Sequence, residues 1–430
     1  MNVTLDVHLD GVAAPVARLT GEEGTMSFRY LTDASQISLS LPVREEAFGD
    51  AEARAFFANL IFENEQREQV MARHGIDNND IAGLLFHLGK DCPGAISCVP
   101  MGDPPGKHPG DLARDYYPLD DLEAVMAGLE RRRLPAGATD PSPLAGVQGK
   151  IAVAVHEGRL LLPKGGAPTT HILKVPRPAE RSLVQDELSL LWIAAKAQDH
   201  PVARAEVLEV GDYRGLLIER YDRRIEDGLV TRIHQEDFCQ ALGFAPSLKY
   251  ERDAAIPERR FDASAIARVL DQTDAPALAR RAFFFGTLLN IALGNTDNHA
   301  KNHSLIYDRG TRPRLAPFYD IVPVMMDGAV NQDFSFRIGS AERLSDLRPE
   351  DLVAFAEAIG FRRFNAGLAR GLREVLQSAA DQINGLQGPG FKLLGDALGS
   401  QMQELSDRLD FDLAIPTRDL FLARGGENSW

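Results

Sequence analysis

The sequence predicts an α+β chain in which a sheet-rich part with one helix precedes a larger, mainly helical part, and an extra α/β unit stands before both. Three observations lead to this prediction. Short runs that alternate apolar and polar residues, typical of strands, are concentrated before residue 222. Beyond about residue 225, helical patterns dominate. Stretches dense in Pro and Gly mark breaks at 99–111 and 135–143. We therefore expect three domains, 1–110, 111–222 and 223–430.

The composition fits a globular protein of a reducing compartment. The chain has 430 residues, 44% of them hydrophobic and 25% charged. Its three cysteines are too few and too scattered for a disulfide framework. The N-terminus MNVTLDVHLDG lacks the basic and apolar segments of a signal peptide, and the longest apolar stretch, 282–293, is shorter than the roughly 20 residues of a membrane span. The sequence thus predicts a cytoplasmic protein without a membrane partner.

The net charge argues against strong nucleic-acid binding by this chain alone. Asp and Glu number 62 against 47 Lys and Arg, which gives −15 at pH 7. Such a surface repels a phosphate backbone unless basic residues gather in one patch.

The N-terminal unit is expected to begin with strands and a helix. VTLDVHLDG alternates apolar and polar residues and ends at a Gly, so it predicts a strand followed by a turn, and ISLSLPV (37–43) predicts a second strand. Residues 51–73 have helical periodicity, with Ala55, Phe56, Leu60 and Ile61 on one stripe.

The middle of the chain predicts a small antiparallel sheet with one helix. After a short helix over 119–132, IAVAV and RLLLP form a hairpin that turns at Glu157-Gly158, and THILKVP is a further strand. Residues 182–197 form the helix, and VLEVG with YRGLLIERYD forms another hairpin. A buried helix, capped by Thr273 or Asp274, then ends at Gly294, a β segment follows over 303–320, and the last 80 residues form amphipathic helices with a break at 388–390.

The segment Gly294 to Asn302 carries the sharpest chemical signal. Polar residues crowd there, directly after an apolar helix. Asp297 and Asn302 are five residues apart, the spacing at which protein kinases place the Asp that accepts the substrate proton and the Asn that holds magnesium. Asp320, in Pro317-Phe318-Tyr319-Asp320, is a second oxygen ligand suited to Mg²⁺. The alternative for all three is that they cap or form turns.

Three further features fit phosphate and nucleotide binding. Lys174 lies on an otherwise apolar strand, where an ammonium needs a partner, and Glu187 on the next helix is a candidate. The loop Ala145-Gly146-Val147-Gln148-Gly149-Lys150 offers backbone amides that could cradle phosphate. Glu219-Arg220-Tyr221-Asp222 marks the junction to the helical part, where backbone groups can meet adenine. Each feature has a plain alternative as a turn or strand end, but together they follow the order of a two-lobe protein-kinase-like fold.

The chain resembles the HipA family of serine/threonine kinase toxins over essentially its whole length. The resemblance rests on VQGK, KGGAPTTHILKVP, IERYDRR, QEDFCQALGFAPSLKYE, GNTDNHAKN and APFYDI, and the N-terminal unit, with FHLGKDCPGAISCV, is similar to the family's extra subdomain. It implies that Asp297 is the catalytic base, that Lys174 binds phosphate, and that Asn302 and Asp320 bind Mg²⁺. For ATP it implies the following contacts: residues 145–150, Lys174, Glu219, Arg220, Tyr221, His299, Lys301, Asn302, Tyr319 and Asp320.

The resemblance also implies regulation and partners. Family members phosphorylate a serine just before the phosphate loop; here Pro143 occupies the usual position and Ser142 is the candidate. A HipB-like helix-turn-helix antitoxin would be the partner through which DNA is reached, and an aminoacyl-tRNA synthetase the protein substrate. Two alternatives stay open: a small-molecule kinase on the same fold, since fold does not fix substrate, and a non-catalytic corepressor of a DNA-binding antitoxin.

Overall fold

The computed structural model describes residues 2–32, 35–61, 65–132, 149–308, 312–386 and 388–415. The chain forms two compact units, each assembled from segments that are distant in the sequence. The first comprises Met1–Val184, Ala203–Ser247 and Ser304–Arg314, and the second comprises Gln185–Val202, Leu248–His303 and Leu315–Trp430. The three predicted domains, 1–110, 111–222 and 223–430, stay a prediction.

The first unit begins with a four-stranded antiparallel sheet in the order β3-β2-β1-β4. Leu5 pairs with Leu19 and Val7 with Ala17, so the alternating pattern places these apolar residues on one buried face. Helices and Phe side chains complete this core. The strands and the helices of this part are β1 (Val3–Leu9), β2 (Ala17–Glu22), β3 (Thr25–Tyr30), β4 (Ile96–Pro100), α1 (Asp50–Phe57), α2 (Glu65–His74) and α3 (Ile81–Leu88).

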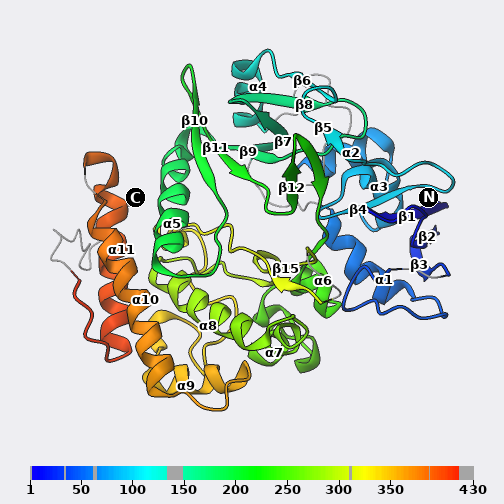
Figure 1. Cartoon of the computed structure of the whole chain (residues 1–430). Helices are drawn as coiled ribbons and strands as arrows, with labels where there is room; N and C mark the ends of the chain where they lie inside the picture. Colours follow the sequence, from blue (N-terminus) through cyan, green and yellow to red (C-terminus); the bar gives the residue numbers. More distant parts are fainter. Residues whose placement is uncertain are drawn as a thin grey trace. The chain divides into compact units, whose positions relative to one another are not determined.

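A six-stranded sheet in the order β10-β11-β9-β7-β8-β6 forms the larger part of the first unit (Figure 1). Its hairpin between β7 and β8 turns at Glu157 and Gly158, both with positive φ, as the sequence predicts. The elements of this part are β6 (Tyr116–Pro118), α4 (Leu122–Glu130), β7 (Gly149–His156), β8 (Arg159–Pro163), β9 (His171–Val175), β10 (Ala205–Val210) and β11 (Tyr213–Glu219). Met126 and Leu129 of α4 pack on Leu173 and Leu217 of this sheet, so one face of the sheet is a core.

The remaining elements of the first unit are short. A small sheet has the order β12-β13-β5, and β14 pairs with β15 directly after the candidate loop of residues 294–302. These elements are β5 (Gly110–Asp111), β12 (Arg223–Glu226), β13 (Leu229–Arg232), β14 (Gln235–Asp237), α6 (Phe238–Leu242), β15 (Ser304–Ile306) and β16 (Arg314–Leu315), the last of which ends in the second unit.

The second unit is helical. Figure 1 shows α10 beside α11, and α8 is almost wholly buried along its second half. Asp262 and Asn365 cap α7 and α10 by accepting hydrogen bonds from Ala265 and Leu368. The helices are α5 (Ser182–Ala197), whose first three residues belong to the first unit, α7 (Ala263–Leu270), α8 (Pro276–Ala292), α9 (Pro349–Ala358), α10 (Ala366–Asn384) and α11 (Lys392–Arg408).

Three predicted elements differ from the structure. ISLSLPV is not a strand: Ser38 and Leu41 form an isolated bridge around a turn, because Ser38 and Ser40 bond to Glu236 and to the Gln240 carbonyl instead of to a neighbouring strand. The helix predicted over 51–73 is divided into α1 and α2. Neither Thr273 nor Asp274 caps α8, which begins with Pro276, a residue whose fixed φ suits the first turn.

Candidate active site

The loop predicted to be catalytic follows the buried end of α8 in the second unit. Gly294 has φ +68°, a backbone conformation that favours glycine, and a Cβ there would lie 2.3 Å from the Met325 sulfur. The Gly294 carbonyl accepts a 3.0 Å hydrogen bond from the Met325 amide. The apolar helix thus ends at a fixed point, and the mainly polar segment 295–302 follows it.

Asp297 and Asn302 are joined within this loop. Asn302 Nδ2 donates a 2.7 Å hydrogen bond to the Asp297 backbone carbonyl. This bond uses the amide nitrogen of Asn302. The amide oxygen, Oδ1, takes no part in it and is of the atom type that Mg²⁺ prefers as a ligand. The Asp297 carboxylate is half-buried and accepts a 2.5 Å hydrogen bond from the Tyr250 hydroxyl.

Asp320 and Tyr319 are tied to the same loop. Asn295 Nδ2 donates a 3.3 Å hydrogen bond to the Asp320 carbonyl, and the Tyr319 hydroxyl donates a 2.7 Å hydrogen bond to the Lys301 carbonyl. Asp320 has φ +58°, in the left-handed region that non-glycine residues rarely occupy. Such strain is concentrated at functional sites. Hydrogen bonds therefore connect the segment that contains Asp320 to the loop that contains Asp297 and Asn302.

The loop contains buried polar atoms without a hydrogen-bond partner among the described residues. Four side-chain atoms are in this position: Asn295 Oδ1, Thr296 Oγ1, Asn298 Nδ2 and His299 Nδ1. Buried polar groups in folded proteins are nearly always paired, so a cluster of unpaired ones fits a site that receives a polar ligand. Burial lowers the pKa of His299 below its usual 6.5, which keeps the imidazole neutral at pH 7.

The oxygen atoms of Asp320 and Asn302 are of the type that magnesium binds. In the part of the chain that the structure describes, no group of three or more His, Cys, Asp or Glu side chains is arranged to hold a metal. Magnesium takes only one or two protein carboxylates and completes its shell with phosphate oxygens and water. The carboxylate of Asp320 and the amide oxygen of Asn302 are ligands of the kind that magnesium takes, and hydrogen bonds of Asn295 and Asn302 connect both residues to the loop.

Lys150 and Lys174 lie opposite each other in the first unit. They are direct cross-strand partners of β7 and β9, so both side chains project from the same face of the sheet. This face is opposite to the one that packs on α4, and it also carries Ala152, Ile172 and Ile218. Two ammonium groups on the same face offer charge-assisted hydrogen bonds to one anion. The pair is therefore a candidate phosphate site beside apolar side chains.

The predicted hinge residues end strand β11. Glu219 is exposed, the Arg220 amide donates a 2.9 Å hydrogen bond to the Thr170 carbonyl, and the Tyr221 hydroxyl donates a hydrogen bond to Gln235. The Arg220 guanidinium pairs with Asp222 at 3.0 Å and also bonds to Thr169. The Arg220 side chain and amide are thus both used within the protein, so the carbonyl is the group of this residue that is left as a candidate for nucleotide contact.

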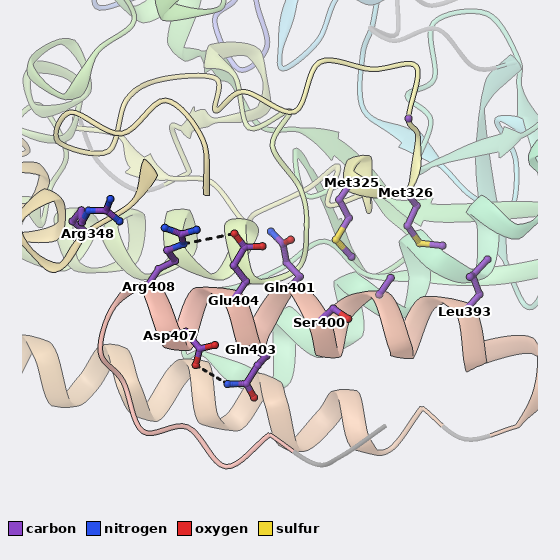
Figure 2. A pocket seen from close by; sticks show the side chains of 12 residues that line it. Met325, Met326, Arg348, Leu393, Ser400, Gln401, Gln403, Glu404, Asp407 and Arg408 are labelled. Carbon is purple, nitrogen blue, oxygen red and sulfur yellow. Dashed lines mark hydrogen bonds and ion pairs between the residues drawn. The ribbon is translucent and has the colours of Figure 1, made fainter. Parts of the chain in front are cut away.

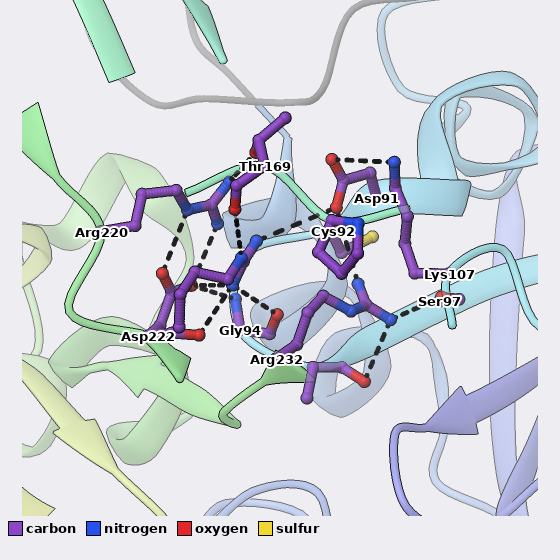
Figure 3. A network of polar contacts seen from close by, with 12 residues as sticks. Asp91, Cys92, Gly94, Ser97, Lys107, Thr169, Arg220, Asp222 and Arg232 are labelled. Carbon is purple, nitrogen blue, oxygen red and sulfur yellow. Dashed lines mark hydrogen bonds and ion pairs between the residues drawn. The ribbon is translucent and has the colours of Figure 1, made fainter. Parts of the chain in front are cut away.

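Arg220 and Asp222 belong to a buried ionic network in the first unit (Figure 3). Arg223 and Arg232 follow on the next two strands, and the remaining members come from distant segments: Asp10, Asp91 and Lys107. Burial opposes the charge of Asp222, but Arg220 and Arg223 outweigh it and lower its pKa to about 2. Burial likewise opposes the charge of Asp91, and the cations around it hold its pKa below the usual range. The network fixes the end of β11 to the segments around Asp91 and Lys107.

Most of the predicted phosphate loop lies outside the described residues. Ser142, Ala145, Gly146, Val147 and Gln148 lie outside the described residues; Gly149 and Lys150 begin β7. Glu187 is buried on the part of α5 that belongs to the second unit, whereas Lys174 belongs to the first. Their pairing stays a prediction.

The second unit also contains a pocket of about 860 Å³. Figure 2 shows Gln401, Glu404 and Arg408 of α11 on the side that faces Met325 and Met326. Its wall is connected to the candidate loop, since the Met325 amide bonds to Gly294 and Gln401 Nε2 donates a 2.8 Å hydrogen bond to the Ile291 carbonyl.

Two features of the site are not predicted by the sequence. Tyr250 lies 47 residues before Asp297, and no local pattern links them. The opposition of Lys150 and Lys174 depends on the register between β7 and β9. This register is not evident from the sequence, because β8 lies between the two strands along the chain. The only sequence signal for Tyr250 is its place in the segment SLKYE, which is part of the family resemblance.

Comparisons with known proteins agree with this fold. The model of the HipA N-terminal domain matches residues 5–99, and that of the HipA-like C-terminal domain matches residues 142–384. A putative kinase, Y4mE of Sinorhizobium fredii, is 33% identical over 335 residues, which cover 75% of this chain and 77% of that protein. The serine/threonine-protein kinase toxin HipA of Shewanella oneidensis is 27% identical over 398 residues, 89% of each protein.

A solved structure gives the same fold. It is the complex of HipA, HipB and operator DNA of the Shewanella oneidensis MR-1 toxin–antitoxin system, in which the matching chain has a TM-score of 0.78 and 24% identity, with 95% of this chain and 98% of that chain covered. The predicted α+β, kinase-like class is confirmed. The chain belongs to the HipA family, whose relatives include a serine/threonine kinase toxin and putative kinases. Among the described residues, no helix has both the length and the apolar character that crossing a bilayer requires.

Proposed function

We propose that this chain is an ATP-dependent serine/threonine protein kinase that acts as the toxin of a toxin–antitoxin pair. The observation that carries the proposal is the loop of residues 294–302, in which Asn302 is bonded to the Asp297 carbonyl while four buried polar atoms lack a partner among the described residues. Family membership adds support, because a curated relative is a kinase toxin.

In this proposal the reaction moves the γ-phosphoryl group of ATP to a Ser or Thr hydroxyl of a protein. Asp297 orients the hydroxyl and accepts its proton. Asn302 and Asp320 hold Mg²⁺, which when bound neutralises charge that develops on the phosphates. Positioning and electrostatics carry most of the catalysis, since phosphoryl transfer asks little covalent chemistry of the protein.

The nucleotide is held by cations and by backbone groups. Lys150 and Lys174 take phosphate oxygens, a role that their cross-strand opposition supports. Amides of residues 145–149 complete the phosphate contacts, and backbone groups of 219–221 meet adenine. His299, Lys301 and Tyr319 line the nucleotide in the same proposal.

The biological part of the proposal concerns target and partner. The target is a protein of translation, an aminoacyl-tRNA synthetase. The partner is a HipB-like helix-turn-helix antitoxin, and DNA is reached mainly through it, which suits a chain with a net charge of −15. The similarity to HipA in the complex with HipB and operator DNA supports this choice of partner.

The test is a phosphoproteome comparison of cells that express the wild-type chain or its Asp297→Asn variant. We expect one or a few proteins to gain phosphoserine or phosphothreonine only with the wild-type chain. Phosphate on small metabolites alone would instead favour a small-molecule kinase, and no transfer at all would favour a non-catalytic corepressor.

A further inference from the structure

The hydroxyl of Tyr250 is bonded to the residue proposed as the base. The Tyr250 oxygen lies 2.5 Å from Asp297 Oδ1 and donates its proton to it. Burial raises the pKa of Tyr250, and the neighbouring carboxylate raises it further, so the phenol stays protonated and a donor over the pH range of most kinases. An ionised carboxylate has about four lone-pair positions on its two oxygens, so this bond orients the group and still leaves Oδ2 for another hydroxyl.

The Tyr250 ring contacts two neighbouring side chains. The Arg252 guanidinium lies 4.1 Å from the ring centroid, and the His299 ring meets the Tyr250 ring edge-on at 5.1 Å. Arg252 Nη1 is itself fixed by a 3.3 Å hydrogen bond to the Phe334 carbonyl. These contacts hold the ring in the orientation that directs its hydroxyl to Asp297.

Backbone bonds join the segment around Tyr250 to the candidate loop. The Ala300 amide donates to the Lys249 carbonyl at 3.0 Å, and the Glu251 amide donates to the Ser335 carbonyl at 2.9 Å. Ser335 Oγ in turn donates to the Thr296 carbonyl at 2.8 Å. Residues 249–251 thus lie against the loop on the two sides of Asp297, with Tyr250 aimed at its carboxylate.

We propose that Tyr250 is a positioning residue for catalysis: its hydroxyl fixes Asp297 by one oxygen so that the other is presented to the acceptor hydroxyl. This inference rests on the proposed function, because it gives Tyr250 a role only if Asp297 is the base. The competing account is that Tyr250 only packs the loop in place. The two accounts predict different effects on turnover when the hydroxyl oxygen of Tyr250 is removed.

Tyr250→Phe removes the hydroxyl and keeps the ring against Arg252 and His299. The readout is transfer of phosphate from γ-labelled Mg-ATP to lysate protein, measured as the rate at saturating ATP and as the half-saturating ATP concentration. We expect the saturated rate to fall about 10- to 100-fold, the range lost when an oriented group is released, with the half-saturating ATP concentration within about twofold. Tyr307→Phe is the matched control, since it removes a tyrosine–carboxylate bond to Glu236 in the other unit and should leave the rate unchanged.

The double variant Tyr250→Phe, Asp297→Asn separates the two accounts. If Tyr250 acts through Asp297, the double variant is no slower than Asp297→Asn alone, because coupled residues are not additive. A Tyr250→Phe rate within twofold of wild type, or a further loss in the double variant, would overturn the inference while the proposed base stands. Wild-type turnover in Asp297→Asn would overturn the proposed base, and the inference with it.

Discussion

Asn302 donates a 2.7 Å hydrogen bond from Nδ2 to the backbone carbonyl of Asp297. The bond joins two residues that are five positions apart, and this spacing is the reason that both were predicted as site residues from the sequence. It also orients the Asn302 side chain. Because Nδ2 is bonded to the Asp297 carbonyl, Oδ1 points to the other side of the amide group. The residue proposed as the proton acceptor and the one proposed as an oxygen ligand for Mg²⁺ are thereby held by one short segment.

Replacement of Asp320 tests the magnesium site. Asp320→Asn removes the charge but tolerates the left-handed backbone at φ +58°, which Asn adopts more readily than Ala. We expect ATP binding to lose most of its dependence on Mg²⁺, since one of two proposed protein ligands loses its charge. Isothermal titration with ATP at several Mg²⁺ concentrations measures this. The exposed Asp412, changed to Asn, is the control, and an unchanged Mg²⁺ dependence in Asp320→Asn would mean that Asp320 is only a turn carboxylate.

Replacement of either opposed lysine tests the phosphate site. Lys150→Met or Lys174→Met keeps the apolar stem and removes one ammonium from the face that carries both. A charge-assisted hydrogen bond contributes roughly 1.5–3 kcal/mol, so the affinity for ATP should fall about 10- to 100-fold. The exposed Lys196, changed to Met, should bind ATP as the wild type does. Equal ATP affinity in all three variants would exclude this pair from the nucleotide site.

The sequence predicted the parts of the site that depend on neighbours along the chain. The loop from Gly294 to Asn302, the hairpin at Glu157-Gly158 and helix α5 follow from local patterns of apolar spacing and turn residues. Features set by strand register or by contacts between distant segments were not predictable. The opposition of Lys150 and Lys174 and the bond between Tyr250 and Asp297 are of this kind.

ISLSLPV shows how a local pattern can mislead. Its alternation is that of a strand, but the serines bond to distant partners. Ser38 Oγ donates a 2.5 Å hydrogen bond to Glu236, and Ser40 Oγ bonds to the Gln240 carbonyl at 2.6 Å. A pattern of alternating residues cannot reveal that a buried carboxylate from almost 200 residues later replaces the neighbouring strand.

The buried carboxyl of Glu236 predicts a dependence of stability on pH. Burial raises its pKa from 4.5 to about 7, and the hydrogen bonds from Ser38, Tyr307 and the Leu39 amide only partly oppose this. Between these two values the native state binds more protons at Glu236 than the unfolded state does, so the free energy of unfolding falls as pH rises through that window. The total change is on the order of 3 kcal/mol.

Urea unfolding from pH 4.5 to 8 measures this contribution against Glu236→Gln, which cannot ionise. We expect the stability of the wild type relative to the variant to decrease as pH rises and to level off above about pH 7. Parallel curves for the two proteins over the whole range would show that Glu236 keeps the same charge in both states.

Self-phosphorylation is predicted at Ser142, which lies outside the described residues. A phosphate there adds roughly −1.5 to −2 charges close in sequence to Gly149 and Lys150, so it would compete for the groups proposed to hold ATP and weaken ATP binding. Peptide mass spectrometry after incubation with Mg-ATP should find phosphate on Ser142 of the wild type and not of Asp297→Asn. Phosphate on Thr139 instead, or no phosphate, would contradict the prediction.

The most direct test of the proposed kinase activity is phosphate transfer from γ-labelled Mg-ATP to lysate protein by the purified chain and by Asp297→Asn. The substitution keeps the shape of the side chain and removes its ability to accept a proton. We predict that the wild type labels serine or threonine of a protein, that Asp297→Asn is slower by at least ~10²-fold, and that both bind ATP with similar affinity. Near wild-type transfer by Asp297→Asn would contradict the assigned base, and the absence of transfer by the wild type would contradict the kinase itself.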